Sequence, residues 1–268
     1  RNAWGGGAVQ WLCPDVAAEF GLDVLPDNQW DVWEDLQKQG VDLVIQPAEG
    51  RKKKMLLADM DSTMIHQECI DELADFAGVK DRVSAITERA MRGDIGFDGA
   101  LTERVGLLKD LPLSALQTCF NERIHLNSGA RTLAQTMKAS GAKTAIVSGG
   151  FTFFTGRIAE QAGFDIHQAN TLIDDETALT GKVGMPILGR QAKLDALNTH
   201  SQDLGGPLNA VAIGDGANDL AMIEAAGLGI AFQAKPIVAA QADCAIAGND
   251  LRAALFFQGY HADEFITD

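Results

Sequence analysis

Residues 55–63 read MLLADMDST, and this stretch decides the fold. Its first part is a short apolar run that ends in polar residues, which is typical of a buried strand in a parallel sheet. Asp59 and Asp61 follow where the strand leaves the sheet, and open α/β sheets bind ligands beyond the carboxyl ends of their strands. Because alternate residues of an extended chain point the same way, we expect the two carboxylates to converge on one small site.

Three more apolar runs recur along the chain, and segments with helical spacing separate them. This alternation predicts an α/β fold built on a doubly wound parallel sheet. The stretch 169-ANTLIDDETALTGKVGMPI-187 breaks the alternation, and its β-branched and turn-forming residues predict a β-hairpin. The predicted strands are 144-TAIVSGG-150, 210-AVAIGDG-216 and 228-LGIAF-232, and the predicted helices lie in 129–141, 151–163, 190–200 and 217–227.

The stretch between the first strand and residue 126 contains several amphipathic helical patterns and no convincing strand. It predicts a helical cap at 68–125, inserted after the first core strand, which can cover the sheet edge as a lid. The other predicted parts are a catalytic core at 55–67 and 126–258, a small N-terminal α+β appendage of unknown role at 1–54, which holds all four tryptophans, and a solvated tail at 259–268.

The chain of 268 residues carries a formal net charge of −15. Nucleic acids and anionic membranes are bound through a basic face, so this charge disfavours both kinds of partner. The one basic run, 51-RKKK-54, directly precedes the first strand and is expected to be a solvated linker. No apolar run approaches the roughly 20 residues that span a bilayer, and no secretory leader follows Arg1, so we expect a cytoplasmic protein. The oligomeric state does not follow from the sequence.

The cysteines and histidines show no pattern of a metal site. Four cysteines without a C-x-x-C pair are expected to be reduced and mostly buried thiols. The five histidines have no ligand-like spacing and are expected at the surface or at helix ends. His66 alone follows the first acidic pair closely enough to line the entrance of a site there.

The acidic pair has two interpretations. Adjacent carboxylates repel each other without a cation, so Asp59 and Asp61 suggest a hard metal such as Mg²⁺. Alternatively, the pair is an acidic turn in which Asp61 caps the next helix. Asp215 favours the metal, because it follows a second strand, among glycines that permit close backbone approach, and can complete an oxygen-rich shell.

Two further elements offer groups for an anionic substrate. Ser148 and Gly149 follow a third strand and supply a hydroxyl and flexible backbone N–H groups suited to phosphate oxygens. Lys193, near the start of a predicted helix, can supply the local positive charge that an anionic substrate needs in this acidic protein. Taken singly, Ser148 and Gly149 are more readily a turn, and Lys193 is more readily a surface lysine. Their order along the chain is what favours a site.

The order DxDST, SGG, a downstream lysine and GDGxND, over residues 55 to 250, resembles the four motifs of the haloacid dehalogenase superfamily of phosphohydrolases. The resemblance implies that Asp59 is the nucleophile that attacks phosphorus and that Asp61 is the general acid/base. It further implies that Ser148, Gly149 and Lys193 hold the phosphoryl group with Asn218 beside them, that Asp59, Asp215 and the backbone carbonyl of Asp61 bind Mg²⁺, and that Asp219 supports the site.

Physical chemistry agrees with these implied roles. A carboxylate can attack phosphorus once a metal and a lysine screen both negative charges, which splits hydrolysis into two easier displacements. The second carboxyl group changes role between the two steps, as general acid and then as general base. Placed donors that clamp the phosphate oxygens meet the main electrostatic demand of phosphoryl transfer.

The predicted cap resembles one branch of that superfamily. The runs 59-DMDSTMIHQECIDELA-74 and 89-RAMRGDIGFDGALTERV-105 look like those of phosphoserine phosphatases. This resemblance implies hydrolysis of O-phospho-L-serine to L-serine and phosphate, the last step of serine biosynthesis. By the same resemblance, Glu68 receives the substrate ammonium, Arg104 binds its carboxylate, and Met91 and Phe97 close the pocket.

Simpler interpretations of the cap residues remain open at the level of sequence. Glu68 can be an acid in the first turn of a helix, and Arg104 can pair with a surface acid such as Asp98 or Glu103. Two other functions also remain: transfer of the phosphoryl group to homoserine, and regulatory binding of a phosphorylated metabolite without catalysis. The sequence departs from many relatives at 126-LNSGARTL-133, where they have a Pro-Gly turn, and this change is expected to affect the hinge between cap and core.

Overall fold

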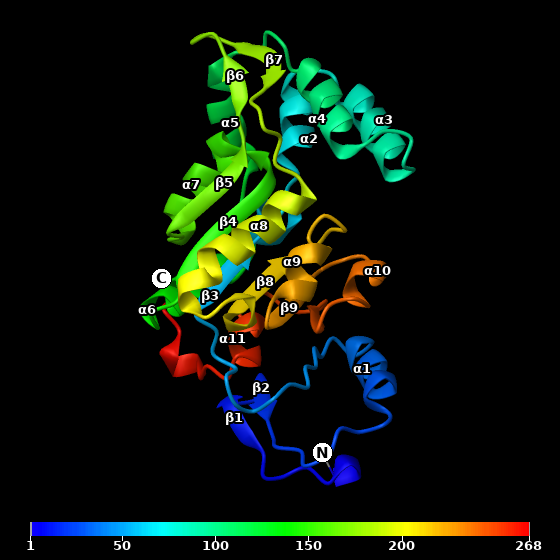
Figure 1. Ribbon diagram of the computed structural model, residues 1–268, viewed down its shortest axis with the longest axis vertical. Coiled ribbons are helices and arrows are strands. Elements are labelled where there is room, and N and C mark those ends of the chain that lie inside the picture. The colour runs from blue at the N-terminus through cyan, green and yellow to red at the C-terminus, as the bar shows by residue number, and fades with distance from the viewer. Residues whose placement is uncertain (1, 268) are drawn as a thin grey trace.

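The computed structural model describes residues 2–267, so the first residue of the predicted appendage and the last residue of the predicted tail lie outside the described residues. Its centre is a six-stranded parallel sheet in the order β10-β9-β8-β3-β4-β5 (Figure 1). This sheet confirms the predicted doubly wound α/β fold. Its strands are β3 (Met55–Ala58), β4 (Lys143–Phe151), β5 (Ile166–Asn170), β8 (Ala210–Gly214), β9 (Leu228–Phe232) and β10 (Cys244–Ile246).

The two faces of the sheet pack against separate layers of helices. In β3, Leu56 and Ala58 belong to one core cluster, whereas Met55 and Leu57 belong to the other. All four are fully buried, because a parallel sheet is covered on both faces. Burying one Leu or Met side chain contributes about 1.5–3 kcal/mol. Helices α6 (Ala130–Ala139), α7 (Thr152–Ala162) and α11 (Ala253–Phe257) cover the first face, and α8 (Arg190–Ser201), α9 (Leu220–Ala225) and α10 (Pro236–Ala239) cover the second.

Strands β5 and β10 have no counterpart in the sequence-based prediction. Strand β5 reads IHQAN and lies at one edge of the sheet, where its polar residues interrupt any apolar run. Strand β10 has only three residues and lies at the opposite edge. Periodicity over so few residues does not distinguish a strand from a loop. Only pairing with their neighbours makes these segments strands.

Four helices between β3 and β4 form the cap, which lies above the sheet in Figure 1. The predicted hairpin is present as β6 (Leu172–Asp174) and β7 (Leu179–Val183), and it packs against the cap. The N–H of Asp110 donates to the carbonyl oxygen of Leu179 at 2.8 Å, and that of Leu113 to Thr177 at 3.0 Å. The hairpin thus extends the cap. Its helices are α2 (Cys69–Phe76), α3 (Lys80–Met91), α4 (Phe97–Gly106) and α5 (Leu113–Arg123).

Two linkers join the cap to the core and run side by side. Ile65 and Leu126 form an antiparallel bridge between them. The buried side chain of Asn127 donates from Nδ2 to the carbonyl oxygens of Thr63 at 2.8 Å and Ile65 at 3.1 Å. Asn127 stands where the sequence departs from the Pro-Gly turn of many relatives. Its side chain ties the two linkers together at the hinge.

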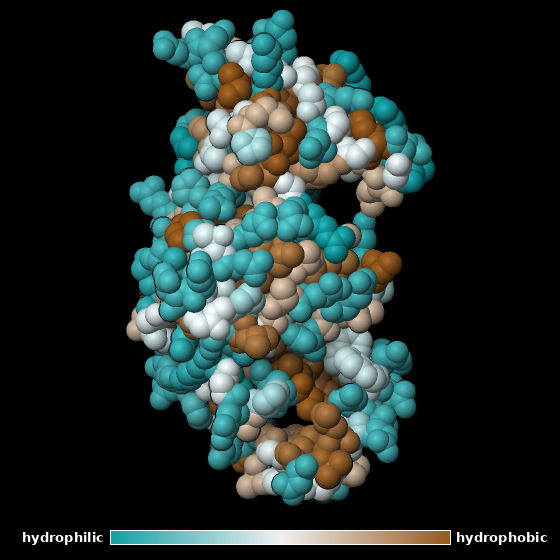
Figure 2. Space-filling view, in the orientation of Figure 1, coloured by the Kyte–Doolittle hydropathy of each residue, from teal (hydrophilic) through white to brown (hydrophobic). Residues whose placement is uncertain are grey.

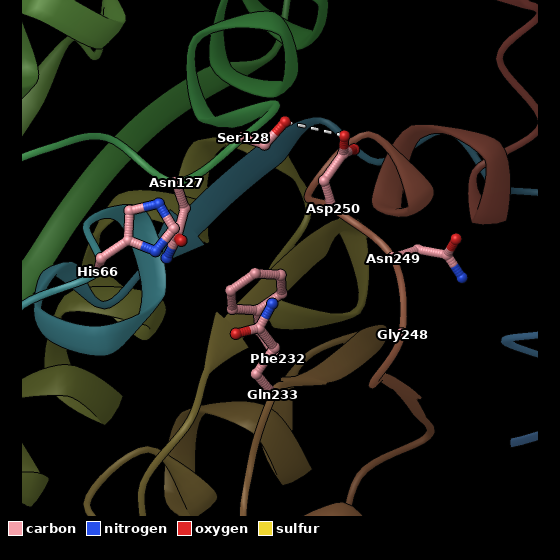
Figure 3. A pocket seen from close by; sticks show the side chains of 8 residues that line it. All are labelled: His66, Asn127, Ser128, Phe232, Gln233, Gly248, Asn249 and Asp250. Carbon is pink, nitrogen blue, oxygen red and sulfur yellow. Dashed lines mark hydrogen bonds between the residues drawn. The ribbon is translucent and has the colours of Figure 1, made fainter. Parts of the chain in front are cut away.

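A cavity of about 410 Å³ opens beside the hinge (Figure 3). His66 and Asn127 line it from the two linkers, and Gln233 lines it from the end of β9. At its rim, Ser128 Oγ donates to Asp250 Oδ2 at 3.0 Å, the dashed contact in Figure 3. His66 therefore lies on the side of the hinge that faces the β9 end of the sheet.

The segment before β3 lies at the end of the molecule opposite the cap (Figure 1). It contains the 3-10 helix η1 (Asn2–Trp4), the antiparallel strands β1 (Gln10–Cys13) and β2 (Ala17–Glu19), and helix α1 (Gln29–Gln37). Its apolar side chains are unusually exposed, with Trp11 at 52% and Trp30 at 61%, and brown atoms gather at this end in Figure 2. Within residues 2–267, no helix has the length and apolar character that a membrane span needs.

Candidate active site

Asp59 lies at the carboxyl end of β3, between the ends of β4 and β8. Its N–H donates to the carbonyl oxygen of Ile213 at 2.9 Å, and its Oδ1 accepts the N–H of Met60 at 2.7 Å. The chain then turns sharply through Ser62, whose φ is 55°. The turn brings Asp61 towards the end of β4, where a Cβ atom on Gly150 would lie 2.5 Å from Oδ2 of Asp61. The two carboxylates lie near enough for the charge of Asp59 to raise the pKa of Asp61.

Lys193 joins two buried carboxylates. Its Nζ lies 2.7 Å from Oδ2 of Asp59 and 2.5 Å from Oδ1 of Asp219, and all three side chains are at most 6% exposed. Burial by itself lowers the pKa of Lys193, but the charges of Asp219 and Asp59 outweigh it and hold that pKa above its ordinary value. The two acids thus favour the charged form of Lys193. Its alternative interpretation as a surface lysine is wrong.

Two glycines allow the loop after β8 to fold back over the strand end. A Cβ atom on Gly214 would collide with the carboxyl group of Asp219, and one on Gly216 would collide with Oδ1 of Asn218. The N–H of Gly216 donates to Oδ2 of Asp219 at 3.0 Å. Asp219 therefore uses one oxygen for the loop and the other for Lys193, while Asn218 lies half-buried in the same loop.

Three carboxylates form a cluster that can hold a metal ion. Asp59, Asp215 and Asp219 each offer one oxygen, and these oxygens lie within 4.8 Å of one another. Thr63 Oγ1 donates to Oδ1 of Asp215 at 3.2 Å. Burial, together with the charge of Asp59, raises the pKa of Asp215 to about 6. Crowded, desolvated carboxylates are stabilised by a cation, and a donor set made of oxygens fits a hard one.

Asp61 makes the helix contact that the acidic-turn interpretation predicted, and it is not part of the carboxylate cluster described above. Its Oδ1 accepts the N–H of Cys69, the first residue of α2, at 3.1 Å, so Asp61 does hold a helix N-terminus. Burial, opposed by this contact and assisted by the charge of Asp59, raises the pKa of Asp61 to about 7. A carboxyl group with a pKa near neutrality is suited both to give and to accept a proton.

The end of β4 places Ser148 and Gly149 opposite these acids. Ser148 is 2% exposed, and its Oγ accepts the N–H of Gly150 at 2.9 Å. Sequence reasoning missed a residue here: the buried Asn170 donates from Nδ2 to the carbonyl oxygen of Gly149 at 2.8 Å. Asn170 lies in the unpredicted strand β5, so no apolar run pointed to it.

Glu68 and Arg104 come from the cap. Oε1 of Glu68 accepts a hydrogen bond from Ser62 Oγ at 2.7 Å. Desolvation and the charge of Asp61 raise the pKa of Glu68, but Glu68 is exposed to water, which weakens both effects. Burial lowers the pKa of Arg104, against the charges of nearby acids that include Glu68. Glu68 and Arg104 thus lie near enough for the charge of Glu68 to act on the pKa of Arg104.

Arg104 does not pair with Asp98 or Glu103, the two surface acids considered above. Its Nη1 donates to Thr87 Oγ1 at 3.4 Å and its Nε to the carbonyl oxygen of Ala100 at 3.3 Å. Glu103 pairs instead with Arg89 at 2.9 Å. The guanidinium of Arg104 is therefore held within the cap by weak neutral acceptors.

Phe97 of the cap packs against the core. A Cβ atom on Gly149 would lie 3.2 Å from Cζ of Phe97, and one on Gly189 would lie 3.2 Å from its Cδ1. The ring therefore lies directly over the end of β4. Met91, by contrast, ends α3 and is 67% exposed. Figure 2 shows the surface indented between the cap and the core.

The cysteines are packing residues, as expected. All four are free, and Cys69, Cys119 and Cys244 are buried. Burial raises the pKa of Cys119 to about 12 and that of Cys69 and Cys244 well above the ordinary value. Protonated thiols of this kind are poor nucleophiles.

Known proteins match both the sequence and the fold of this chain. The family model of the haloacid dehalogenase-like hydrolases matches residues 56–224. A phosphoserine phosphatase of Archaeoglobus fulgidus is 43% identical over 88% of this chain and 70% of its own. Two solved structures cover 76% of this chain and 98% of theirs: a phospho-aspartyl intermediate analogue of phosphoserine phosphatase (TM-score 0.70, 42% identity) and a substrate-bound phosphoserine phosphatase complex (TM-score 0.71, 41% identity). The chain therefore belongs to the phosphoserine phosphatase family of the haloacid dehalogenase-like hydrolases.

Proposed function

We propose that this chain hydrolyses O-phospho-L-serine to L-serine and inorganic phosphate through an aspartyl-phosphate on Asp59. The observation that carries the proposal is the buried Lys193, which holds Asp59 at the end of β3 beside Ser148 and Gly149. The relatives support it, because one solved phosphoserine phosphatase is an analogue of a phospho-aspartyl intermediate and another has substrate bound.

Asp59 and Asp61 perform the two steps. A carboxylate oxygen of Asp59 attacks phosphorus, the bond from phosphorus to the serine oxygen breaks, and protonated Asp61 gives its proton to that oxygen. In the second step, Asp61 takes a proton from water while the water oxygen attacks phosphorus, which frees phosphate and restores Asp59. The hydrogen bond from the Cys69 N–H holds Asp61 in place for both transfers.

The remaining core residues receive the phosphate. Ser148, Gly149 and Lys193 bind its oxygens, with Asn218 beside them, and Asp219 keeps Lys193 in position. Asp59, Asp215 and the backbone carbonyl of Asp61 would hold Mg²⁺, because oxygen donors suit this ion. Of these, Asp59 and Asp215 belong to the carboxylate cluster described above. Bound there, the ion supplies positive charge that offsets the charge of the phosphate.

The cap selects the substrate. Glu68 receives the ammonium group of phosphoserine, and Arg104 binds its carboxylate through a bidentate contact. Met91 and Phe97 close the pocket over the bound amino acid. In this division of labour, residues 68–125 form the selecting cap, 55–67 and 126–258 form the catalytic core, and 1–54 and 259–268 lie outside the site.

A phosphate-release panel tests this function. Phosphoserine, phosphothreonine, several sugar phosphates and p-nitrophenyl phosphate are compared with Mg²⁺ and with chelator. We expect phosphoserine to have the highest kcat/KM, and activity to vanish with chelator. Added homoserine is expected to yield no phosphohomoserine. Equal kcat/KM for phosphoserine and p-nitrophenyl phosphate would refute the proposed selectivity, and phosphohomoserine as the main product would refute hydrolysis.

A further inference from the structure

Asn170 ends β5, and its side chain is buried between two loops that the proposed function uses. Nδ2 donates to the carbonyl oxygen of Gly149 at 2.8 Å and to that of Leu188 at 3.1 Å, while Oδ1 accepts the N–H of Leu188 at 2.7 Å. The amide therefore uses both of its N–H donors and its acceptor. Each of these groups left unpaired in the interior costs about 1–3 kcal/mol, so the three bonds hold the loops in one arrangement.

The first loop is the end of β4. The carbonyl group of Gly149 and the N–H group of Gly150 belong to one planar peptide unit. A hydrogen bond that holds the carbonyl therefore also sets the direction of the N–H, which donates to Ser148 Oγ at 2.9 Å. Through this peptide, Asn170 orients the Ser148 hydroxyl and the backbone donors that face the phosphate.

The second loop leads into α8. Leu188 stands directly before Gly189 and α8, and α8 carries Lys193. The paired bonds between Asn170 and Leu188 resemble one rung of a β-ladder, in which a side-chain amide replaces a backbone amide. Asn170 thus sets where the helix of Lys193 begins relative to the end of β4.

The same two loops support the cap. The Phe97 ring lies against Gly149 on the first loop and against Gly189 on the second. Because Asn170 bonds to Gly149 and to the neighbour of Gly189, one buried amide holds both surfaces on which Phe97 lies.

We propose that Asn170 is a positioning residue, which sets the Ser148–Gly150 loop against Lys193 and thereby determines how tightly the site binds phosphate. The proposal rests on the function assigned above to Ser148, Gly149 and Lys193. Aspartate in place of Asn170 keeps the shape and the acceptor but removes both donors. Alanine removes all three bonds.

The experiment compares Asn170→Asp and Asn170→Ala with the control Gln258→Ala. Gln258 is an equally buried amide, and its bonds to Lys53 and Ala254 lie away from the site. Both Asn170 variants lose the two donated hydrogen bonds, and this loss is expected to raise the KM for phosphoserine and the inhibition constant of inorganic phosphate together, by roughly 10–100-fold. The inhibition constant of L-serine, which the cap residues bind, is expected to stay at the wild-type value.

A purely structural role gives a different pattern. The positioning role would be refuted if the folded Asn170 variants had a lower kcat but kept the wild-type KM and the wild-type inhibition constant of phosphate. It would also be refuted if they did not differ from Gln258→Ala. It would also be refuted if neither Asn170 variant folded, as judged by circular dichroism, while Gln258→Ala did. Should the wild type release no phosphate from phosphoserine, the function proposed above fails instead. Calorimetric titration with inorganic phosphate would then still show whether Asn170 sets phosphate affinity.

Discussion

Lys193 Nζ lies 2.7 Å from Oδ2 of Asp59, and the two side chains are only 2% and 6% exposed. A buried cation that contacts the proposed nucleophile screens its charge and fixes its direction. A second buried carboxylate, Asp219, holds the same Nζ at 2.5 Å. The site is therefore already organised within the protein before any substrate binds.

Asp59→Asn is expected to abolish phosphoserine turnover and preserve the fold. An amide of the same shape keeps the acceptor for the Met60 N–H but is no nucleophile. Phosphate release and circular dichroism are the two measurements. Normal release by the folded variant would rule out the covalent route.

Lys193→Met is expected to lower the free energy of unfolding by about 3–5 kcal/mol, because it leaves Asp59 and Asp219 buried without a counter-charge. The matched control is Lys138→Met. Lys138 pairs with Asp165 at 2.6 Å but is 48% exposed, so its loss costs about 0–1 kcal/mol. Urea denaturation measures both. If both variants lost the same free energy of unfolding, the buried ion pairs of Lys193 would be no more important for stability than the exposed pair of Lys138.

The metal-free protein is expected to melt at a higher temperature at about pH 5.5 than at about pH 8. Burial is the main cause that raises the pKa values of Asp61 and Asp215, to about 7 and 6. A raised carboxyl pKa gives stability at low pH that is lost as pH rises through the folded-state value. Mg²⁺ is expected to raise the melting temperature more at the higher pH, where these carboxylates are charged.

Thermal melts with and without Mg²⁺ at the two pH values test this linkage. Asp215→Asn is the control, because it removes one acid of the carboxylate cluster and is expected to reduce the Mg²⁺ effect. If Mg²⁺ raised the melting temperature equally at both pH values, or equally in Asp215→Asn and the wild type, the proposed metal site would be contradicted.

Arg104→Met is expected to lower kcat/KM for phosphoserine by roughly 10–100-fold, because a charged hydrogen bond to the substrate carboxylate is lost. Activity on p-nitrophenyl phosphate, which has no carboxylate, is expected to stay near the wild-type value. Arg89→Met is the control, since Arg89 pairs with Glu103 on the exposed side of the cap. An equal loss of kcat/KM on both substrates would show that Arg104 does not bind the substrate carboxylate.

Asn127→Ala is expected to destabilise the protein by about 1–3 kcal/mol, because the carbonyl groups of Thr63 and Ile65 lose their donor at the hinge. Asn209→Ala is the control: its single bond to Gly205 is exposed and 3.3 Å long, so its loss costs within about 0.5 kcal/mol. Urea denaturation compares the two. If Asn127→Ala were no more costly than Asn209→Ala, the hinge bonds would contribute nothing.

The sequence predicted the core strands and the site acids because both follow local rules. The runs at 55–58 and 228–232 are fully buried strands, and an apolar run between turn residues marks such strands directly. The polar strand β5 and the three-residue β10 lack that signal, so they were missed. The roles of the site residues stay predictions that the experiments above address.

The sequence by itself determined which chemical groups stand at the strand ends, because strand periodicity and turn residues act over a few neighbouring positions. Tertiary structure alone decided which of these groups touch. Lys193 meets Asp59 across 134 positions of chain, and Asn170 reaches back to Gly149 from an edge strand that has no apolar pattern. Such contacts arise from the packing of whole elements and from the need to pair every buried polar group. Neither can be predicted from a few neighbouring residues.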